Sequence, residues 1–393
     1  MELSVIVMWL GFALASYSVV GNDVIQTLGT FLTSNEQRMK WWVLWLFAAT
    51  IMVSALALGY ANNDIDYGRL DKFQMPEVYY WYYLLPPIVL LGITRLGIPV
   101  STTFMILTLF SLQGIPNEIP EMVASVFDTD TKLGGMIQKS LMGYVIAFSS
   151  ALVIYLAITR LSEKYFIENP IKTDQKMNVP TLLALSAIAG IIFYFLIVGD
   201  LSTPLRISIS LLAVAVSVGA GLTVSRSQFW TGFQWFTTGF LWFQWLTQDL
   251  ANIYIYLRGG EGLTVIGFIA SVAILLGLLA YIFYARGGAV QQVVREKTNT
   301  DDIRSATFID LIYGIILYIF KYNSLGLFEG KLPMSTTWVF IGLLAGRELG
   351  MRLNLEKRIS GKVGKMVMSD LAKILFGLVV SVILVFVIKI LAG

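Results

Sequence analysis

The sequence predicts an all-α polytopic membrane protein with two inverted-topology repeats, about eight full spans and two re-entrant helical hairpins. Three observations predict this fold class. Of the 393 residues, 56% are hydrophobic and 13% are charged, whereas a soluble chain carries about 25% charged residues. The apolar residues come in runs of about 20, the length of a membrane-spanning helix. Two short polar motifs occur once in each half of the chain.

Eight apolar segments are long enough to cross the membrane. The first has neither the basic flank nor the small-residue cleavage site of a signal peptide, so we expect it to stay in the protein as a span. The eight predicted spans are residues 3–30, 41–60, 139–159, 179–198, 205–224, 228–257, 262–284 and 371–391.

Two further apolar segments, 80–113 and 306–345, are each interrupted near the middle. The first is interrupted at residues 97–99 and the second at residues 330–333, and both interruptions contain glycine and proline. Glycine and proline at the centre of a hydrophobic segment favour a hairpin whose tip stops partway through the membrane. We therefore predict a re-entrant helical hairpin in each half of the chain.

The charges of the loops predict how the spans are oriented. Loops 31–40, 286–304 and 346–370 are basic, whereas loops 61–79 and 114–138 are acidic. With the basic loops inside, the first hairpin enters from outside, the second enters from inside, and both termini lie outside. Matching hairpins that enter from opposite faces indicate inverted repeats, the architecture of secondary transporters.

The polar motifs support the same division. GNDVIQ at 21–26 has a counterpart in TQDLAN at 247–252, and PVSTT at 99–103 has a counterpart in PMSTT at 333–337. Because both pairs occur in the same order, two elements repeat and not one. The predicted units are a first repeat at 1–160, a connector with two additional spans at 161–227, and a second repeat at 228–393.

The first motif pair predicts a cation site. A carboxylate within an apolar span is costly unless it lines water, pairs with another group or binds a cation. Carboxylate and amide oxygens on one helical face suit a hard cation such as Na⁺. The alternative is that both aspartates lie at the headgroup boundary. The side chains concerned are Asn22, Asp23 and Gln26 in the first half, and Gln248, Asp249 and Asn252 in the second.

The second motif pair predicts an anion site. Each copy places hydroxyls where a helix begins after a break, and free backbone N–H groups at such a helix start favour an anion. Two tips that approach from opposite faces can clasp one tetrahedral oxyanion. Simple helix capping is the alternative. The hydroxyls concerned are those of Ser101, Thr102, Thr103, Ser335, Thr336 and Thr337.

The composition excludes several kinds of chemistry. The chain has no Cys and no His, which removes disulfides, thiolate catalysis and histidine bases. Its net charge of +3 includes no basic block, so we expect no nucleic-acid partner. An intramembrane aspartyl hydrolase is an alternative, since two membrane carboxylates can share a proton, but the chain has no Gly-x-Gly-Asp motif. We expect no enzyme and no cofactor apart from a coupling ion.

Three features give weaker signals. Arg95 lies near the first hairpin tip, where it can neutralise an anion, pair with a carboxylate or extend to the membrane surface. A ladder of small residues spaced four apart favours close helix packing; its members are Gly342, Gly346 and Gly350. The aromatic run 229–245 faces lipid, a neighbouring helix or a subunit interface, so a homodimer is an open alternative.

These motifs resemble the inorganic phosphate transporter (PiT) family. That family carries a Gly-Ala-Asn-Asp-Val-Ala-Asn-type signature and a Pro-Val-Ser-Thr-Thr-type hairpin motif in each half. GNDVIQTLGT at 21–30 is similar to the signature and TQDLAN to a decayed copy, while GIPVSTT and LPMSTT are similar to the hairpin motif. The chain departs from the pattern at four positions. Gln26 and Gln248 replace Asn, and Phe104 and Trp338 stand where His is common.

The resemblance implies a secondary active transporter in the cell membrane that carries inorganic phosphate with a cation by alternating access, with Na⁺ favoured over H⁺. It implies that Asn22, Asp23, Asp249 and Asn252 are cation ligands and that the two Ser-Thr-Thr triplets are substrate ligands. A sulfate permease of the same fold and an anion channel of the same architecture are alternatives. The expected partners are a small inorganic anion and the lipid bilayer.

Overall fold

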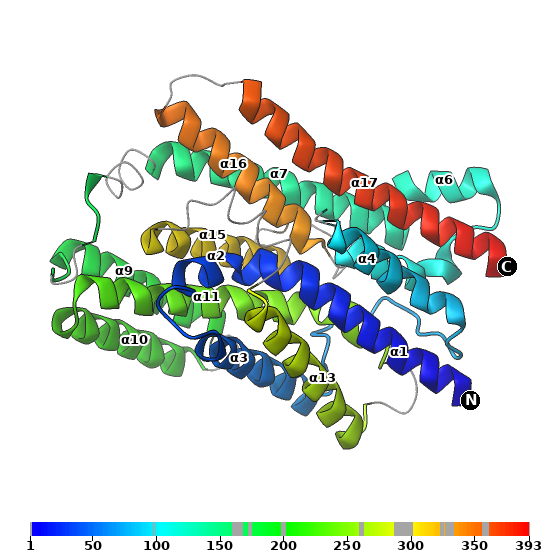
Figure 1. The fold of residues 1–393 in the computed structure, drawn as a ribbon, viewed down its shortest axis with the longest axis horizontal. Helices are drawn as coiled ribbons and strands as arrows, with labels where there is room; N and C mark the ends of the chain where they lie inside the picture. Colours follow the sequence, from blue (N-terminus) through cyan, green and yellow to red (C-terminus); the bar gives the residue numbers. More distant parts are fainter. Residues whose placement is uncertain are drawn as a thin grey trace.

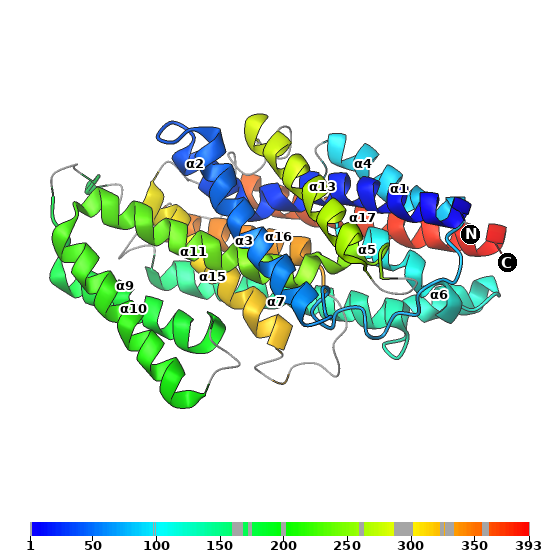
Figure 2. The same ribbon diagram turned by 90° about the horizontal axis from the view of Figure 1, so that it is seen from below.

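The computed structural model describes residues 2–96, 98, 100–158, 168–171, 175–197, 202–258, 263–286, 302–322, 326, 334–355 and 361–392. Throughout this part of the chain the regular structure is helical, and no strand occurs in it. The helices form one bundle, and both termini lie at the same end of the molecule (Figures 1 and 2). Termini at the same end are what the predicted topology requires.

The first part of the chain, up to residue 158, contains long helices interrupted by short helical turns. Its elements are α1 (Glu2–Val19), the π-helical η1 (Val20–Val24), α2 (Ile25–Asn35), α3 (Trp41–Ala61), η2 (Trp81–Leu84), α4 (Leu85–Arg95), α5 (Thr102–Leu107), η3 (Leu109–Gly114), α6 (Ile119–Phe127) and α7 (Lys132–Ile158).

The remainder follows the same pattern of long helices joined by short connections. Its described elements are α9 (Val179–Ile192), η4 (Phe193–Ile197), α10 (Thr203–Thr223), α11 (Arg226–Asp249), α12 (Ala251–Tyr254), α13 (Val265–Tyr284), α15 (Ile303–Tyr322), α16 (Thr336–Leu355) and α17 (Gly361–Ala392).

Seven of the described helices are long and apolar enough to cross a membrane. They confirm the prediction of an integral, multi-pass membrane protein. The predicted span at 179–198 appears as a shorter apolar helix, Val179–Phe195. The predicted span at 228–257 appears as α11 followed by α12, and most of its second half is buried inside the bundle.

The first predicted hairpin has arms that are too short to cross a bilayer. Helix α4 has 11 residues, which is about 16 Å at the α-helical rise, against a hydrocarbon core of about 30 Å. The returning arm consists of α5, with six residues, and η3. Gly97 and Pro99, at the predicted tip, lie outside the described residues. The segment thus has the dimensions of a re-entrant hairpin.

The second predicted hairpin differs from the expectation in its first arm. Helix α15 has 20 residues and is long and apolar enough to cross a membrane. Its last turn reaches the segment that follows α3, because the Lys321 ammonium lies 4.9 Å from the centre of the Tyr67 ring. The apolar run from Ile303 to Tyr322 contains no proline, so nothing in it ends the helix early. The predicted interruption at 330–333 lies outside the described residues.

The two helices that carry the Asp motifs run in opposite directions. The end of α2 meets the beginning of α11, where Asn35 Nδ2 donates to Gln234 Oε1 at 2.8 Å. Further along, Thr30 of α2 and Thr238 of α11 donate to the same carboxylate, that of Asp310. Antiparallel motif helices are what an inverted repeat requires. The unit boundaries at 160 and 227 stay predictions.

Glycines allow α7 and α16 to pack closely. A Cβ on Gly342 would lie 2.5 Å from the Tyr144 carbonyl oxygen, and one on Gly346 would lie 2.1 Å from the Phe148 carbonyl oxygen. Only glycine fits at such distances, since real Cβ contacts are longer. The ladder of small residues therefore serves helix packing, as its spacing predicts.

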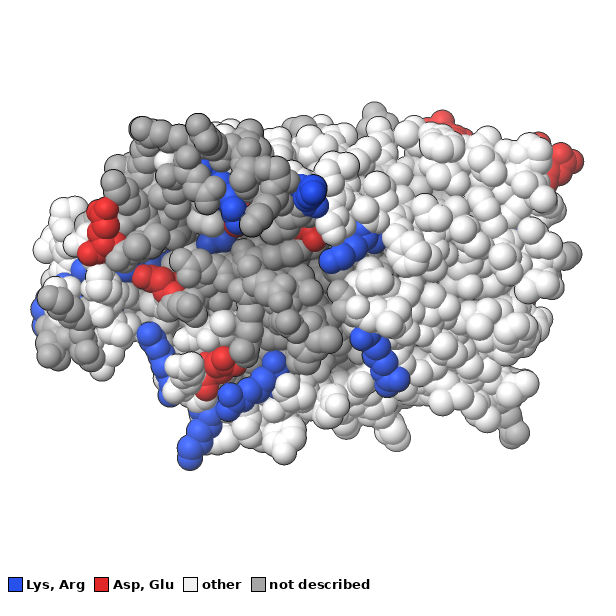
Figure 3. Space-filling view, turned by 45° about the horizontal axis from the view of Figure 1, so that its top comes forward, with Lys and Arg blue, Asp and Glu red and all other residues white. Residues whose placement is uncertain are grey.

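Loop segments predicted to share a side of the membrane lie together. The turn from Glu36 to Trp41 and Arg286 line one surface pocket, and the Tyr79 N–H donates to Ser4 Oγ at 2.8 Å. In Figure 3, Lys and Arg side chains gather over one half of the visible face. The other half is nearly free of charge and has acidic side chains at the end where the termini lie. This separation agrees with the predicted orientation.

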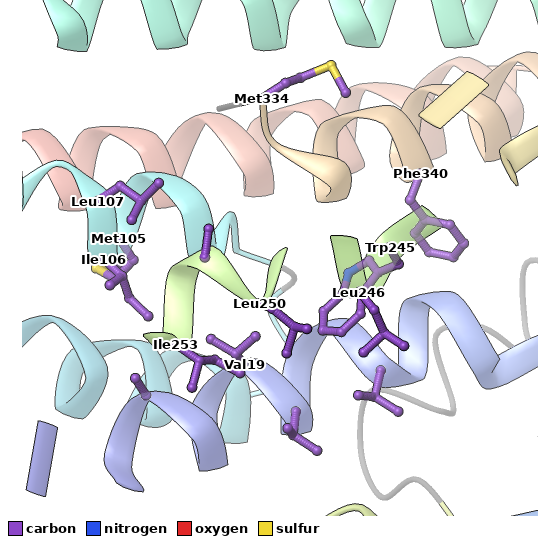
Figure 4. Packing of buried hydrophobic residues seen from close by; sticks show 14 of the residues in the cluster. Val19, Met105, Ile106, Leu107, Trp245, Leu246, Leu250, Ile253, Met334 and Phe340 are labelled. Carbon is purple, nitrogen blue, oxygen red and sulfur yellow. The ribbon is translucent and has the colours of Figure 1, made fainter. Parts of the chain in front are cut away.

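Apolar side chains enclose the centre of the bundle, where the broken segments meet (Figure 4). Val19 of α1, Leu107 of α5, Leu250 before α12 and Met334 before α16 are all buried there. Such a shell excludes water, so the polar groups inside it must satisfy one another or a ligand.

Candidate functional site

Both motif aspartates lie at irregularities in their helices. Asp23 lies in the π-helical turn η1 between α1 and α2, and Asp249 is the last residue of α11, just before α12. Both side chains are at most 1% exposed. Irregular turns of this kind free backbone groups and are frequent at functional sites. The two carboxylates therefore have similar settings in the two halves.

The Asp23 carboxylate is held by one amide and one hydroxyl. Asn22 Nδ2 donates to Asp23 Oδ1 at 2.7 Å and to the Val100 carbonyl oxygen at 2.7 Å. Thr102 Oγ1 donates to Asp23 Oδ2 at 2.6 Å. Val100 and Thr102 belong to the first hairpin, so the first Asp motif and the first Ser-Thr-Thr triplet are in direct contact.

The Asp249 carboxylate is held in the same way. Thr336 Oγ1 donates to Asp249 Oδ2 at 2.5 Å, and Asn252 Nδ2 donates to Asp249 Oδ1 at 3.0 Å. Thr103 Oγ1 lies 3.5 Å from the same Oδ1 atom. Each carboxylate thus accepts hydrogen bonds from an amide of its own motif and from a threonine at the start of a helix.

The two halves share one site. Asn252 Nδ2, from the second half, also donates to Thr102 Oγ1 at 3.1 Å and to Thr103 Oγ1 at 3.3 Å. In the other direction, Thr337 Oγ1 donates to the Val100 carbonyl oxygen at 3.4 Å. Contacts in both directions place all four motifs around a single buried centre.

Among the described residues, three buried amide oxygens have no partner, those of Asn22, Gln248 and, one turn before Gln248, Gln244. Asn22 Oδ1 and Gln248 Oε1 are buried, and neither has a hydrogen-bond partner within the described part of the chain. The orientation of both amides is fixed by their nitrogens. Asn22 Nδ2 faces two acceptors, and Gln248 Nε2 faces the carbonyl oxygens of Gln244 and Leu317, each at 3.2 Å. The residue that precedes each motif aspartate therefore carries an unpartnered oxygen.

The serines of the two triplets have a different role from the threonines. Ser101 Oγ accepts from the Phe104 N–H at 3.2 Å, and Ser335 Oγ accepts from the Trp338 N–H at 3.3 Å. Both serines are therefore helix N-caps. The Phe104 and Trp338 rings meet edge to face at 5.9 Å between centroids. At these two positions, where the PiT family commonly has His, the chain thus has aromatic rings that contact each other.

One predicted cation ligand fits less well. Gln26 is 3% exposed and its Nε2 atom has no partner among the described residues. An amide nitrogen is a donor and does not coordinate a cation. Gln26 stays a prediction as a ligand, which would have to use its oxygen.

Several charged residues that the motifs do not mark are also buried, among them Asp310, Arg69 and Lys139. Asp310 of α15 is fully buried and accepts from Thr30 and Thr238 at 2.5 Å each. Arg69, in the segment after α3, and Lys139 of α7 are each 6% exposed. Arg95, which the sequence places near the first tip, is exposed. The signal that could have found these residues is a charge in an apolar span, and it applies only to Asp310 and Lys139.

Fold and site define an integral, multi-pass membrane protein whose broken segments meet at one buried polar centre. Over its length the chain is similar to the solved structure of "The sodium-dependent phosphate transporter". The TM-score is 0.63 and the identity is 17%, and the match covers 99% of this chain and 98% of that chain. This likeness shows the fold, and at that level it confirms the resemblance that the motifs predict. No protein-family model and no curated protein matches the sequence.

Proposed function

We propose that the chain is a secondary active transporter that moves inorganic phosphate together with Na⁺ by alternating access. The unpartnered oxygens of Asn22 and Gln248, each on the residue that precedes a motif aspartate, carry this proposal. A buried acceptor without a partner destabilises the protein. A cation that takes these lone pairs and the adjacent carboxylate removes that cost. The likeness to a sodium-dependent phosphate transporter supports the same cation and anion.

Each half offers a set of oxygens that suits a hard cation. In the first half the set is the Asp23 carboxylate, Asn22 Oδ1 and Thr102 Oγ1, and in the second half it is the Asp249 carboxylate, Gln248 Oε1 and Thr336 Oγ1. Among the described residues no three Asp or Glu side chains gather, so the sets combine one carboxylate with neutral oxygens. Coupling to a proton would require only the carboxylates, which a proton can bind without other oxygens. The neutral amide oxygens therefore favour Na⁺ over H⁺ as the coupling ion.

The start of α16 is the part of the centre best suited to the anion. This helix has 20 residues, and its first N–H groups, those of Thr336 and Thr337, lack intrahelical acceptors. The positive end of the helix dipole adds to their attraction for an oxyanion. The threonine hydroxyls of both triplets complete the donors once cations take over the carboxylates that three of them face here.

This arrangement couples the anion to the cation. Two buried carboxylates repel an oxyanion at the same centre until cations neutralise them. Cation binding therefore raises anion affinity, and by linkage the anion raises cation affinity to the same extent. Because both halves contribute ligands, a rocking of one half against the other exposes the centre to one side and then to the other.

The arrangement of the carboxylates speaks against the hydrolase alternative. An aspartyl dyad shares one proton between two adjacent carboxyl groups. Here each carboxylate has its own amide and hydroxyl donors, and no hydrogen bond joins Asp23 to Asp249 in the described structure. We therefore propose no enzymatic activity.

Uptake of radiolabelled phosphate and sulfate into proteoliposomes tests the proposal. We expect phosphate to accumulate under an inward Na⁺ gradient, and not under a choline gradient or a proton gradient. The matched controls are the Asp23→Asn and Asp249→Asn variants, which keep the side-chain shape and remove the charge. Preference for sulfate would identify a sulfate permease, and flux without dependence on any cation would identify a channel. Either result would replace the proposal.

A further inference from the structure

Within the described residues, Arg69 is a buried cation that forms no salt bridge. It lies in the segment between α3 and η2 and is 6% exposed. Its hydrogen bond from Nη2 to the Met334 carbonyl oxygen is long, at 3.4 Å. Nε has no acceptor, and no carboxylate within the described residues lies within 4 Å of the guanidinium. A buried charge without a partner is strongly destabilising.

The guanidinium is charged under physiological conditions. Burial lowers the pKa of Arg69 to about 10, while the negative charges of Asp249 and Asp66 raise it. At neutral pH the group therefore stays protonated. The influence of Asp249 also shows that Arg69 lies within electrostatic range of the buried centre.

The fold holds Arg69 in this position. Arg258 forms salt bridges with Asp66 at 2.8 Å and with Asp71 at 3.0 Å, on either side of Arg69 in the chain. Tyr67 OH donates to the Ala55 carbonyl oxygen at 2.7 Å, which ties the same segment to α3. These contacts hold the segment in place on both sides of Arg69. The fold therefore keeps the Arg69 side chain buried.

Arg69 points at the start of α16. Met334, whose carbonyl it contacts, directly precedes Ser335, the N-cap of α16. The Ser335 N–H donates to Ser140 Oγ of α7 at 3.0 Å. The neighbouring Lys139 is also buried, and its charge lies close enough to Arg69 for the two to interact. Arg69 and the buried Lys139 therefore both lie close to the helix start that we propose as the anion site.

We propose that Arg69 is a further substrate ligand, whose guanidinium holds a tetrahedral oxyanion against the start of α16. This inference rests on the proposed function. The planar fork of a guanidinium matches two oxygens of phosphate or sulfate, which an ammonium does not. The bound anion also supplies the negative charge that the described residues do not place beside Arg69.

Equilibrium binding of phosphate to the purified protein in Na⁺ tests this role. We expect Arg69→Gln to weaken phosphate binding roughly ten- to a hundredfold, the range for losing a hydrogen bond between charged groups. We expect Arg69→Lys, which keeps the charge without the fork, to be intermediate. Arg95→Gln is the control, since it removes an exposed arginine from the end of α4, in the first hairpin. Binding of ²²Na⁺ without phosphate should be retained in all three variants, and in Arg69→Gln it should be equal or tighter, because a positive charge near Asp249 is removed.

The outcomes separate this inference from the proposed function. If wild-type protein binds phosphate or sulfate and Arg69→Gln binds it equally well, Arg69 is not a ligand, while the proposed function stands. If wild-type protein binds neither anion, the proposed function itself fails. If Arg69→Gln does not fold, the Arg69→Lys variant tests the inference. Phosphate affinity equal to that of the wild type in Arg69→Lys would contradict a bidentate contact from the guanidinium.

Discussion

The Thr336→Val substitution tests whether the threonines of the triplets are ligands of the site or only helix caps. Thr336 Oγ1 lies 2.5 Å from Asp249 Oδ2, and the side chain is 2% exposed. Valine keeps the shape and removes only the hydroxyl. Ser335→Ala is the matched control from the same triplet, because Ser335 Oγ accepts from the Trp338 N–H and caps α16.

Thr336→Val should change the Na⁺ dependence of uptake, whereas Ser335→Ala should change stability. A hydroxyl that interacts with a charged partner contributes about 1.5–3 kcal/mol, or roughly ten- to a hundredfold in affinity. If Thr336 Oγ1 coordinates the cation, Thr336→Val raises the Na⁺ concentration for half-maximal phosphate uptake by that factor. Removal of the Ser335 cap should instead lower stability by about 1 kcal/mol, with the Na⁺ dependence retained.

The assay is Na⁺-dependent phosphate uptake in proteoliposomes, with thermal unfolding of the same preparations. The direction in which the Na⁺ affinity changes separates the two roles. If the Thr336 hydroxyl only donates to the carboxylate, its loss leaves Asp249 less satisfied without cation, and Na⁺ affinity stays the same or rises. Unchanged or improved Na⁺ affinity in Thr336→Val would therefore refute the assignment of the threonine as a ligand.

Three other substitutions or labels test separate parts of the structure. Gly346→Ala places a methyl group 2.1 Å from the Phe148 carbonyl oxygen and should cost about 1–3 kcal/mol of stability, whereas Gly364→Ala, which meets nothing within 4 Å, should leave the melting temperature unchanged. Asp310→Leu leaves two buried threonine hydroxyls without their acceptor, so it should lower the melting temperature while Na⁺-dependent uptake is retained. If the variant keeps its stability and loses the Na⁺ dependence of uptake, Asp310 is a cation ligand instead. Single cysteines in the segment after α3 should react with an impermeant reagent from outside, and those in the turn between α2 and α3 only from inside; reaction of both from one side would contradict the predicted orientation.

The sequence predicted the elements that depend on composition and repetition. Runs of apolar residues identify the membrane helices, because a bilayer imposes their length. Duplication of the motifs predicted that residues as distant as Asn22 and Asn252 lie together. In the structure Asn22 contacts Asp23 and the first hairpin, and Asn252 contacts Thr102 of that hairpin. Whether these side chains bind the predicted ions stays a prediction.

Features set by tertiary structure could not be predicted in the same way. Helix α15 is long enough to cross a membrane, which a re-entrant arm is not, and no proline in its sequence ends it early. Arg69 occurs in an acidic loop that the charge pattern places at the surface. The salt bridges of Arg258 and the hydrogen bond of Tyr67 hold that loop against the bundle. The hydroxyl partners of Asp310 come from two helices distant in the sequence, and no motif signals them.

The dependence of phosphate affinity on Na⁺ tests most directly the claim that one buried centre holds both ions. Phosphate dissociation constants are measured by equilibrium binding over a range of Na⁺ concentrations, with choline keeping the ionic strength constant. We expect the dissociation constant to fall as Na⁺ rises, and this dependence to disappear in a variant that carries both Asp23→Asn and Asp249→Asn. A phosphate affinity that is the same in Na⁺ and in choline would contradict a shared centre.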